Sequence, residues 1–221
     1  MSQTYHDDLD YLADEYRWLR VRCLRIQEER SEQDAKGGSV HVGRKTYQTC
    51  GCHIDELREK EAALRSAIDS RLEAHSRAAD VPDLGLFRLC QEHGLSPEEK
   101  LVLLIAGAPG IGQTFSEDVL AGLGTYHGAV SVEDATVVLG ADTLRDCLNH
   151  RAMLRPDSKL VSTGLIELRS PSYPVGPETL MATDVRLTLA TLATLTGDKG
   201  FLDEAALEAA MEDDSDPWGP D

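Results

Sequence analysis

The chain has 221 residues, of which 41% are hydrophobic, and this is enough to bury a core as one large domain or as a domain with an accessory element. Its 39 acidic and 22 basic residues give a formal net charge of −17, which repels the phosphate backbone that supplies most nucleic-acid affinity. Residues 1–30 carry charges throughout and the chain has no long apolar run. The sequence therefore predicts neither a secretory signal nor a membrane span, and we expect a cytoplasmic protein.

The first predicted element is a long helix with a single apolar stripe. Its members recur at alternating spacings of three and four residues, which is the seam of a coiled-coil heptad: Leu9, Leu12, Tyr16, Leu19, Cys23 and Ile26. A second polar helix, over about residues 53–79, carries a similar stripe. Two such helices predict an antiparallel helical hairpin over residues 1–79.

The seam of the first helix supports two hypotheses. In the first, Leu9, Leu12, Tyr16, Leu19 and Ile26 bind a protein partner, or a second copy of this chain in a homo-oligomer. In the second, the same side chains pack on the second helix within one chain. Substitution of the seam leucines separates the two, because loss of binding with unchanged melting supports docking.

Residues 35–53, AKGGSVHVGRKTYQTCGCH, predict a loop between the two helices. The loop holds His41, Cys50, Cys52 and His53, which are ligand types that zinc accepts. A Cys-x-Cys-His run is not among the common chelate spacings, however, and the fourth ligand lies nine residues upstream. A small zinc site and a plain loop with exposed thiols both remain open; the spacing favours the loop, and we expect no cofactor.

A second region, residues 80–197, begins within the helix-breaking stretch AADVPDLG, which we take as the domain boundary. In SPEEKLVLLIAGAP, Ser96 is a predicted N-cap, Pro97 follows at the first helical position, and Glu99 completes a capping box. We expect the apolar run 101–106 to be a buried helix that ends at Gly107.

The stretch GAPGIGQT, residues 107–114, resembles the phosphate-binding pattern G-x-x-x-x-G-K-[ST] through Gly107, Gly112 and Thr114. Gln113 stands in the lysine position, and a helix is predicted where a phosphate loop requires a strand. Two acidic residues close behind would repel phosphates. A degenerate P-loop nucleotide-binding protein is therefore kept only as an alternative function.

Downstream, short helices are predicted over 115–124, 131–140 and 142–150, the last with Leu144 and Leu148 four residues apart. A strand follows over 159–169, then a loop rich in Pro and Gly that returns near 178–182. A last helix is expected over about 184–196, starting at Asp184 and stopping at Gly197. The predicted fold is mainly α: an N-terminal helical hairpin plus a winged-helix-like helical domain with a small β-hairpin.

Two segments, GLSPEEKLVLLIAGAP (94–109) and LRPDSKLVSTGLIEL (154–168), resemble the winged-helix-containing N-terminal regions that precede the AAA+ module in a group of bacterial ATPases. The first helix, DDLDYLADEYRWLRVRCLRIQ, is more loosely similar to the first helix of those regions. No intact Walker A lysine, acidic Walker B strand or arginine finger accompanies them here. The resemblance implies a non-catalytic recognition or assembly region, whose partner would be an AAA+ ATPase or its substrate.

A winged helix often binds DNA, and the basic cluster Arg145, Arg151, Arg155 and Lys159 makes a DNA-binding regulator the second alternative. The acidic chain makes nucleic acid an unfavourable partner. No arrangement of His and acidic residues suggests catalysis, so we expect no enzyme activity.

The tail, residues 198–221, is acidic and is predicted to be disordered. Trp218 either anchors it to a partner pocket or belongs to a solubilising linker, and the composition favours the linker. The leading hypothesis is a protein–protein interaction or assembly module that docks through the first-helix seam.

Overall fold

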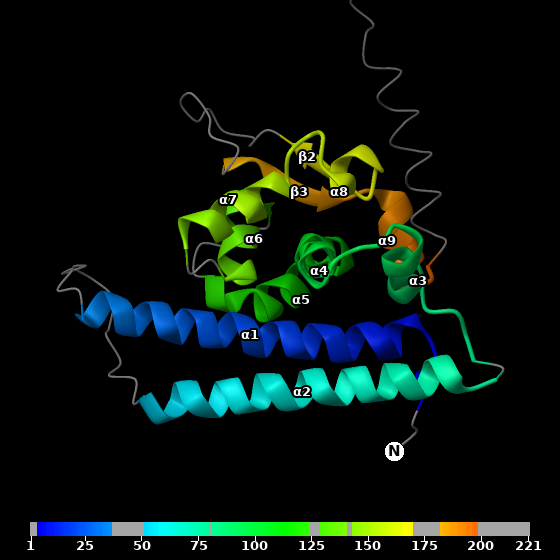
Figure 1. Ribbon diagram of the computed structural model, residues 1–221, viewed down its shortest axis with the longest axis horizontal. Coiled ribbons are helices and arrows are strands. Elements are labelled where there is room, and N and C mark those ends of the chain that lie inside the picture. Colours follow the sequence, from blue (N-terminus) through cyan, green and yellow to red (C-terminus); the bar gives the residue numbers. More distant parts are fainter. Residues whose placement is uncertain are drawn as a thin grey trace, which may run out of the picture.

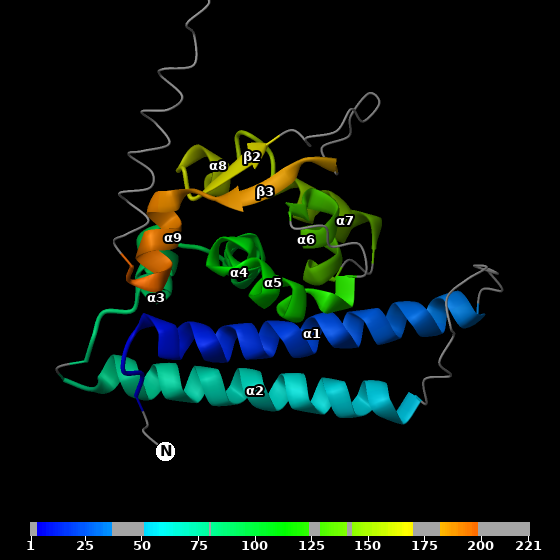
Figure 2. The ribbon, with the colours of Figure 1, turned by 180° about the vertical axis from the view of Figure 1, so that it is seen from behind.

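The computed structural model describes residues 4–36, 51–79, 81–123, 129–140, 143–169 and 182–198. Helices α1 (Asp8–Lys36) and α2 (Gly51–Arg77) form an antiparallel hairpin along the longest axis of the molecule. All other elements lie on the α1 side of this hairpin, so α1 is enclosed between α2 and the rest of the chain (Figures 1 and 2).

The remaining elements are short, apart from one central helix. In chain order the helices are α3 (Gly85–Glu92), α4 (Pro97–Ile111), α5 (Gln113–Val119), the 3-10 turn η1 (Ala121–Leu123), α6 (Val132–Leu139), α7 (Leu144–Ala152), α8 (Lys159–Ser162) and α9 (Leu189–Thr196). Strands β1 (Val130–Ser131), β2 (Ile166–Arg169) and β3 (Asp184–Leu187) form an antiparallel sheet in the order β1-β3-β2. Val185 of the central strand pairs with Val130 on one side and Leu168 on the other.

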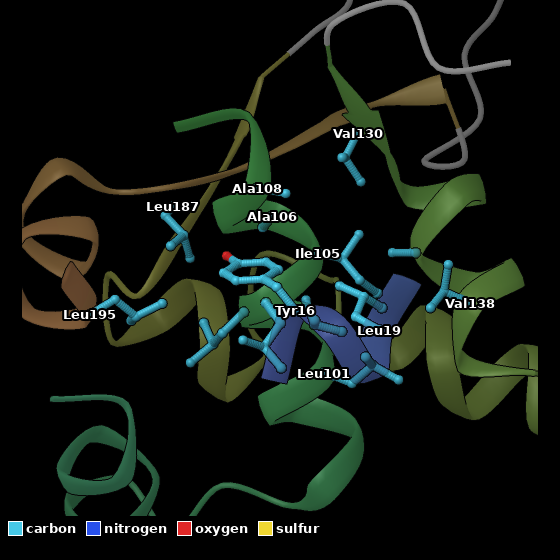
Figure 3. Close-up of a cluster of buried hydrophobic side chains, with 14 of the residues drawn as sticks. Tyr16, Leu19, Leu101, Ile105, Ala106, Ala108, Val130, Val138, Leu187 and Leu195 are labelled. Carbon is cyan, nitrogen blue, oxygen red and sulfur yellow. The ribbon is translucent and has the colours of Figure 1, made fainter. Parts of the chain in front are cut away.

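The core is built around α4. Every residue from Leu101 to Ala108 is buried, because α1, α5, α6 and the sheet surround this helix. Figure 3 shows the seam side chains Tyr16 and Leu19 packed against α4, with Leu187 of β3 and Val138 of α6 on either side. The hairpin and the winged part therefore share one continuous hydrophobic core.

The opposite side of α1 is ionic. Arg71 of α2 pairs with Asp10 and Asp14, at 2.5 and 3.0 Å. Glu61 of α2 pairs with two arginines of α1, Arg22 at 2.9 Å and Arg25 at 2.6 Å. The two long helices are thus held together by charge pairs as well as by apolar contacts, and α1 buries both of its long faces.

The expected capping box of Ser96 and Glu99 is present, and residues 101–106 are helical as predicted. The helix does not end at Gly107, as we expected, but continues to Ile111. A Cβ at Gly107 would lie 2.9 Å from both Leu187 and the Tyr16 hydroxyl, so this glycine permits close packing and is not a stop. Pro109 lies inside this helix, in its last turn, where its missing N–H removes one hydrogen bond of the helix.

Two other expected boundaries are wrong. The first part of the strand predicted over 159–169 is the helical turn α8, and the strand begins only at Ile166. The helix predicted from Asp184 begins at Leu189, because Asp184–Leu187 forms β3 with Val185 and Leu187 buried alternately. Its end at Gly197 is confirmed.

The predicted fold class is confirmed: mainly helical, with an N-terminal hairpin and a small antiparallel sheet. The sheet has three strands because the short β1 joins the expected β-hairpin. The predicted return at 178–182 lies mostly outside the described residues, as does the acidic tail beyond Asp198.

Candidate functional site

The α1 seam is an internal packing surface in this structure. Leu12, Tyr16, Leu19 and Ile26 are buried, and only Leu9 is exposed, at 59%. A partner therefore cannot contact these four side chains while the chain is folded, which corrects the proposed docking role of the seam. The alternative of packing within the chain holds, but Tyr16 and Leu19 pack mainly on the α4 side and not on α2 as expected.

The glycine-rich stretch forms a helix, a glycine and a second helix. Gly107 lies inside α4, and Gly112 adopts an extended conformation between α4 and α5. The amide of Gln113 donates a hydrogen bond to Glu117 at 3.0 Å, and Thr114 is exposed in the same short helix. The strand–loop–helix arrangement of a phosphate cradle is therefore not formed by these residues.

The described residues do not bring the predicted zinc ligands together. His41 and Cys50 lie outside the described residues, and so does the side chain of Cys52. His53 is exposed on the first turn of α2, with its Nδ1 atom 3.8 Å from a carboxylate oxygen of Glu56. Within the described ranges, no three His, Cys, Asp or Glu side chains gather as a metal site would require.

A cleft of about 520 Å³ lies where α1 and α2 meet the start of α4. Most of its charged groups are already paired: Arg65 and Lys100 both bind Glu15, and Arg22 binds Glu61. Cys90 also lines the cleft, and burial raises the pKa of its thiol, which makes it a poor nucleophile. We interpret the cleft as part of the packing interface between the α1–α2 hairpin and α4.

Helix α7 presents two of the four exposed large apolar side chains of the described residues. Leu144 is 77% exposed and Leu148, one turn later on the same side, is 51% exposed. None of the residues of α7 is buried. The helix is stabilised instead by its N-cap, because Thr143 and Asp146 form a capping box with each other.

Three arginines lie close in sequence to these leucines. Arg145 lies on α7, Arg151 lies one turn beyond Leu148, and Arg155 follows in the next turn of chain. Within the described part of the chain, none of the three guanidinium groups has a carboxylate within ion-pair distance. Asp146 is engaged with Thr143, whose hydroxyl lowers the pKa of this carboxyl by hydrogen bonding. We call Leu144, Arg145, Leu148, Arg151 and Arg155 the α7 face.

The contrast with the rest of the molecule is what distinguishes the α7 face. Arginines elsewhere, such as Arg22, Arg65 and Arg71, bind carboxylates of neighbouring helices. A molecule with a net charge of −17 thus displays exposed leucines on α7 near arginines that have no ion-pair partner among the residues whose structure is described. The sequence identified the arginine cluster, but the exposure of the leucines depends on tertiary packing and could not be predicted from their spacing.

An antiparallel sheet of order β1-β3-β2, with α4 before β1 and with α6 and α7 between β1 and β2, defines a winged-helix protein. A model of the family described as "Winged helix domain, variant" matches residues 1–207, and the chain belongs to this family. The match includes α1 and α2, so the hairpin belongs to the family unit. No curated protein matches the chain, and no solved structure does.

In the order of elements, α7 corresponds to the second helix of a helix-turn-helix motif. In DNA-binding helix-turn-helix proteins the second helix of the motif lies in the major groove of DNA, and α7 follows α6 in that order. A helix that could cross a bilayer is not found in the part of the chain that the structure describes.

Proposed function

We propose that the protein is a non-catalytic interaction module whose α7 face binds an acidic and apolar segment of a partner protein. The observation that carries this proposal is the pair of exposed leucines, Leu144 and Leu148, among three arginines without ion-pair partners in the described residues. Burial of one leucine side chain stabilises a complex by about 1.5–3 kcal/mol. The arginines would attract carboxylates during the encounter and pair with them afterwards.

The chemistry of the α7 face restricts the kind of partner segment that can bind there. Leu144 and Leu148 are one helical turn apart, so they match a partner helix with apolar residues at the same spacing. Arg145, Arg151 and Arg155 favour acidic residues beside that apolar stripe. An amphipathic acidic helix satisfies both requirements.

A more specific form of this proposal names an AAA+ ATPase as the protein with which the chain works. The resemblance of residues 94–109 and 154–168 to the N-terminal regions of such enzymes supports a recognition region of, or an adaptor to, an AAA+ ATPase. The partner segment would then belong to the ATPase module or to its substrate. The conformation of residues 107–114 gives no support to the degenerate P-loop alternative.

The test uses a fluorescein-labelled acidic amphipathic peptide with two leucines four residues apart. We expect it to bind the full chain, and we expect Leu148→Ser to weaken binding about tenfold or more. Leu9→Ser is the matched control, because Leu9 is equally exposed but lies among acidic residues at the start of α1. Absence of peptide binding, or equal weakening by both substitutions, would overturn the proposal.

A DNA-binding regulator is the second candidate, because the same three arginines lie on the helix that follows α6. A duplex DNA probe at low salt separates the two. DNA binding that is lost with Arg151→Ala but unchanged by Leu148→Ser would favour the regulator. Calorimetric titration of the full chain with a purified bacterial AAA+ module tests the ATPase part of the proposal alone.

A further inference from the structure

The described surface offers few places where an acidic apolar segment could bind. The large exposed apolar residues are Leu9, Ile111, Leu144 and Leu148. Leu9 is flanked by Asp8 and Asp10, and Ile111 lies close in sequence to acidic residues of α5. The acidic neighbours of Leu9 and Ile111 include Asp10 and Asp118, which pair with Arg71 and Arg20, whereas Arg145 and Arg151 beside the α7 leucines have no ion pair within the described residues. An acidic segment is therefore attracted most strongly to α7.

The chain itself contains such a segment. Residues 199–221 hold eight acidic residues and a single basic one, Lys199. Among the acids stand Leu207 and Met211, four residues apart as Leu144 and Leu148 are, and Trp218 follows. Apolar anchors and carboxylates are therefore combined as the α7 face requires.

The start of this segment lies in an unfavourable electrostatic environment. Gly197 is close to Asp8, because a Cβ at Gly197 would lie 2.9 Å from the carboxylate of Asp8. The acidic residues that follow therefore leave the folded part beside the acidic start of α1. Repulsion there directs the segment away from its own exit point.

The linker length permits contact with α7. Helix α9 follows the end of β3, whereas α6 and α7 lie near its start, where Ser131 pairs with Asp184 (Figure 1). Strand β3 has four residues and spans about 13 Å, and the eight residues of α9 add about 12 Å between its end and Gly197. Residues 199–206, in extended form, reach about 26–29 Å before Leu207.

We propose that the acidic segment 199–221 of this chain occupies the α7 face and competes there with the partner. This inference rests on the proposed function, since it assigns an intramolecular competitor to the same surface. The acidic segment would leave the α7 face when a partner segment binds there more tightly, or when the carboxylates of the acidic segment are neutralised.

The experiment uses the full chain with four tail acids neutralised: Glu208→Gln, Glu212→Gln, Asp213→Asn and Asp214→Asn. We expect this variant to bind the labelled peptide about tenfold more tightly than the wild type, because the competitor is weakened. Amide exchange in α7 should become faster in the variant without peptide. The matched control neutralises four exposed acids of α2, Asp55, Glu56, Glu59 and Glu73, with the same change in net charge.

The outcomes separate this inference from the proposed function. If peptide binding depends on Leu148 but is unchanged by the tail substitutions, with unchanged exchange in α7, the inference is overturned and the proposed function stands. If the tail substitutions speed exchange in α7 but no variant binds the peptide, the tail contact stands and the proposed function is overturned. An equal effect of the α2 control shows only a general charge effect and also overturns the inference.

Discussion

At the scale of single residues, Glu15 joins three elements. Its carboxylate is fully buried, at 0% exposure, and accepts hydrogen bonds from Arg65 of α2 at 2.9 and 3.1 Å and from Lys100 of α4 at 2.5 Å. We expect Glu15→Gln to lower the free energy of unfolding by about 3 kcal/mol, because the partly buried cations Arg65 and Lys100 lose a buried counter-charge. Urea unfolding measures this. Glu73→Gln, which removes an exposed ion pair with Arg77, should cost less than about 1 kcal/mol.

The effect of Glu15 depends on pH in a defined direction. Burial raises the pKa of this carboxyl, but Lys100 and Arg65 outweigh burial, and the net pKa is lowered. The folded pKa therefore lies below the unfolded value of about 4.3, and the stabilisation is complete above that value. It is lost as the pH falls through the folded pKa. The stability difference between wild type and Glu15→Gln should be constant near neutral pH and shrink below about pH 4. A difference that widened under acid would contradict this assignment.

The two glycines of the glycine-rich stretch have different environments. A Cβ at Gly107 would meet Leu187 and the Tyr16 hydroxyl at 2.9 Å, whereas a Cβ at Gly112 would have no neighbour within 4 Å. We expect Gly107→Ala to lower stability by about 1–3 kcal/mol through overpacking, although alanine is the better helix former. Gly112→Ala should be nearly neutral because its backbone is extended. Thermal unfolding of both variants checks this, and a greater loss at Gly112 would be inconsistent with the packing.

At the scale of elements, α1 is a core helix of the winged part. Leu19 is fully buried, whereas Leu9 on the same seam is 59% exposed. We expect Leu19→Ala to cost about 2–5 kcal/mol through the cavity it leaves. Leu9→Ala should change stability by no more than about 0.5 kcal/mol. Equal and small effects on unfolding would mean that the seam does not contribute to the core.

The elements that the sequence predicted well are those with local signals. The heptad spacing of α1 and the capping box at Ser96 depend on residues that are close in the chain, and the structure contains both. The spacing of the seam residues did not show which element packs against them. Periodicity defines which side chains share a face of the helix, but not what covers that face. Asp184 resembled a helix cap because its role in β3 depends on strands distant in sequence.

For the candidate site, too, some features could be predicted from the sequence and others could not. The arginines near α7 could be recognised from composition, but no local rule shows that Leu144 and Leu148 stay uncovered. Their four-residue spacing is equally typical of a buried stripe. Exposure is decided by how α7 sits on α6, which the sequence alone does not specify.

At the scale of the whole molecule, the boundary predicted between residues 79 and 80 can be tested as a folding boundary. The α1 side chains Tyr16 and Leu19 lie in the same core cluster as Ile105 and Val138 of the winged part. Loss of the hairpin would therefore open that core to water. We expect hairpin and winged part to unfold in a single transition.

Trp18 is the natural reporter of the hairpin. Its ring lies 5.6 Å from the guanidinium of Arg22 and 5.4 Å from that of Arg65, so it senses the contact between α1 and α2. Trp218→Phe leaves Trp18 as the single tryptophan of the chain. In urea, the fluorescence of Trp18 and the far-UV circular dichroism of the whole chain should then have the same midpoint. Two separate midpoints, with fluorescence changing first, would mean that the hairpin folds independently, and the shared core would then contribute little to cooperativity.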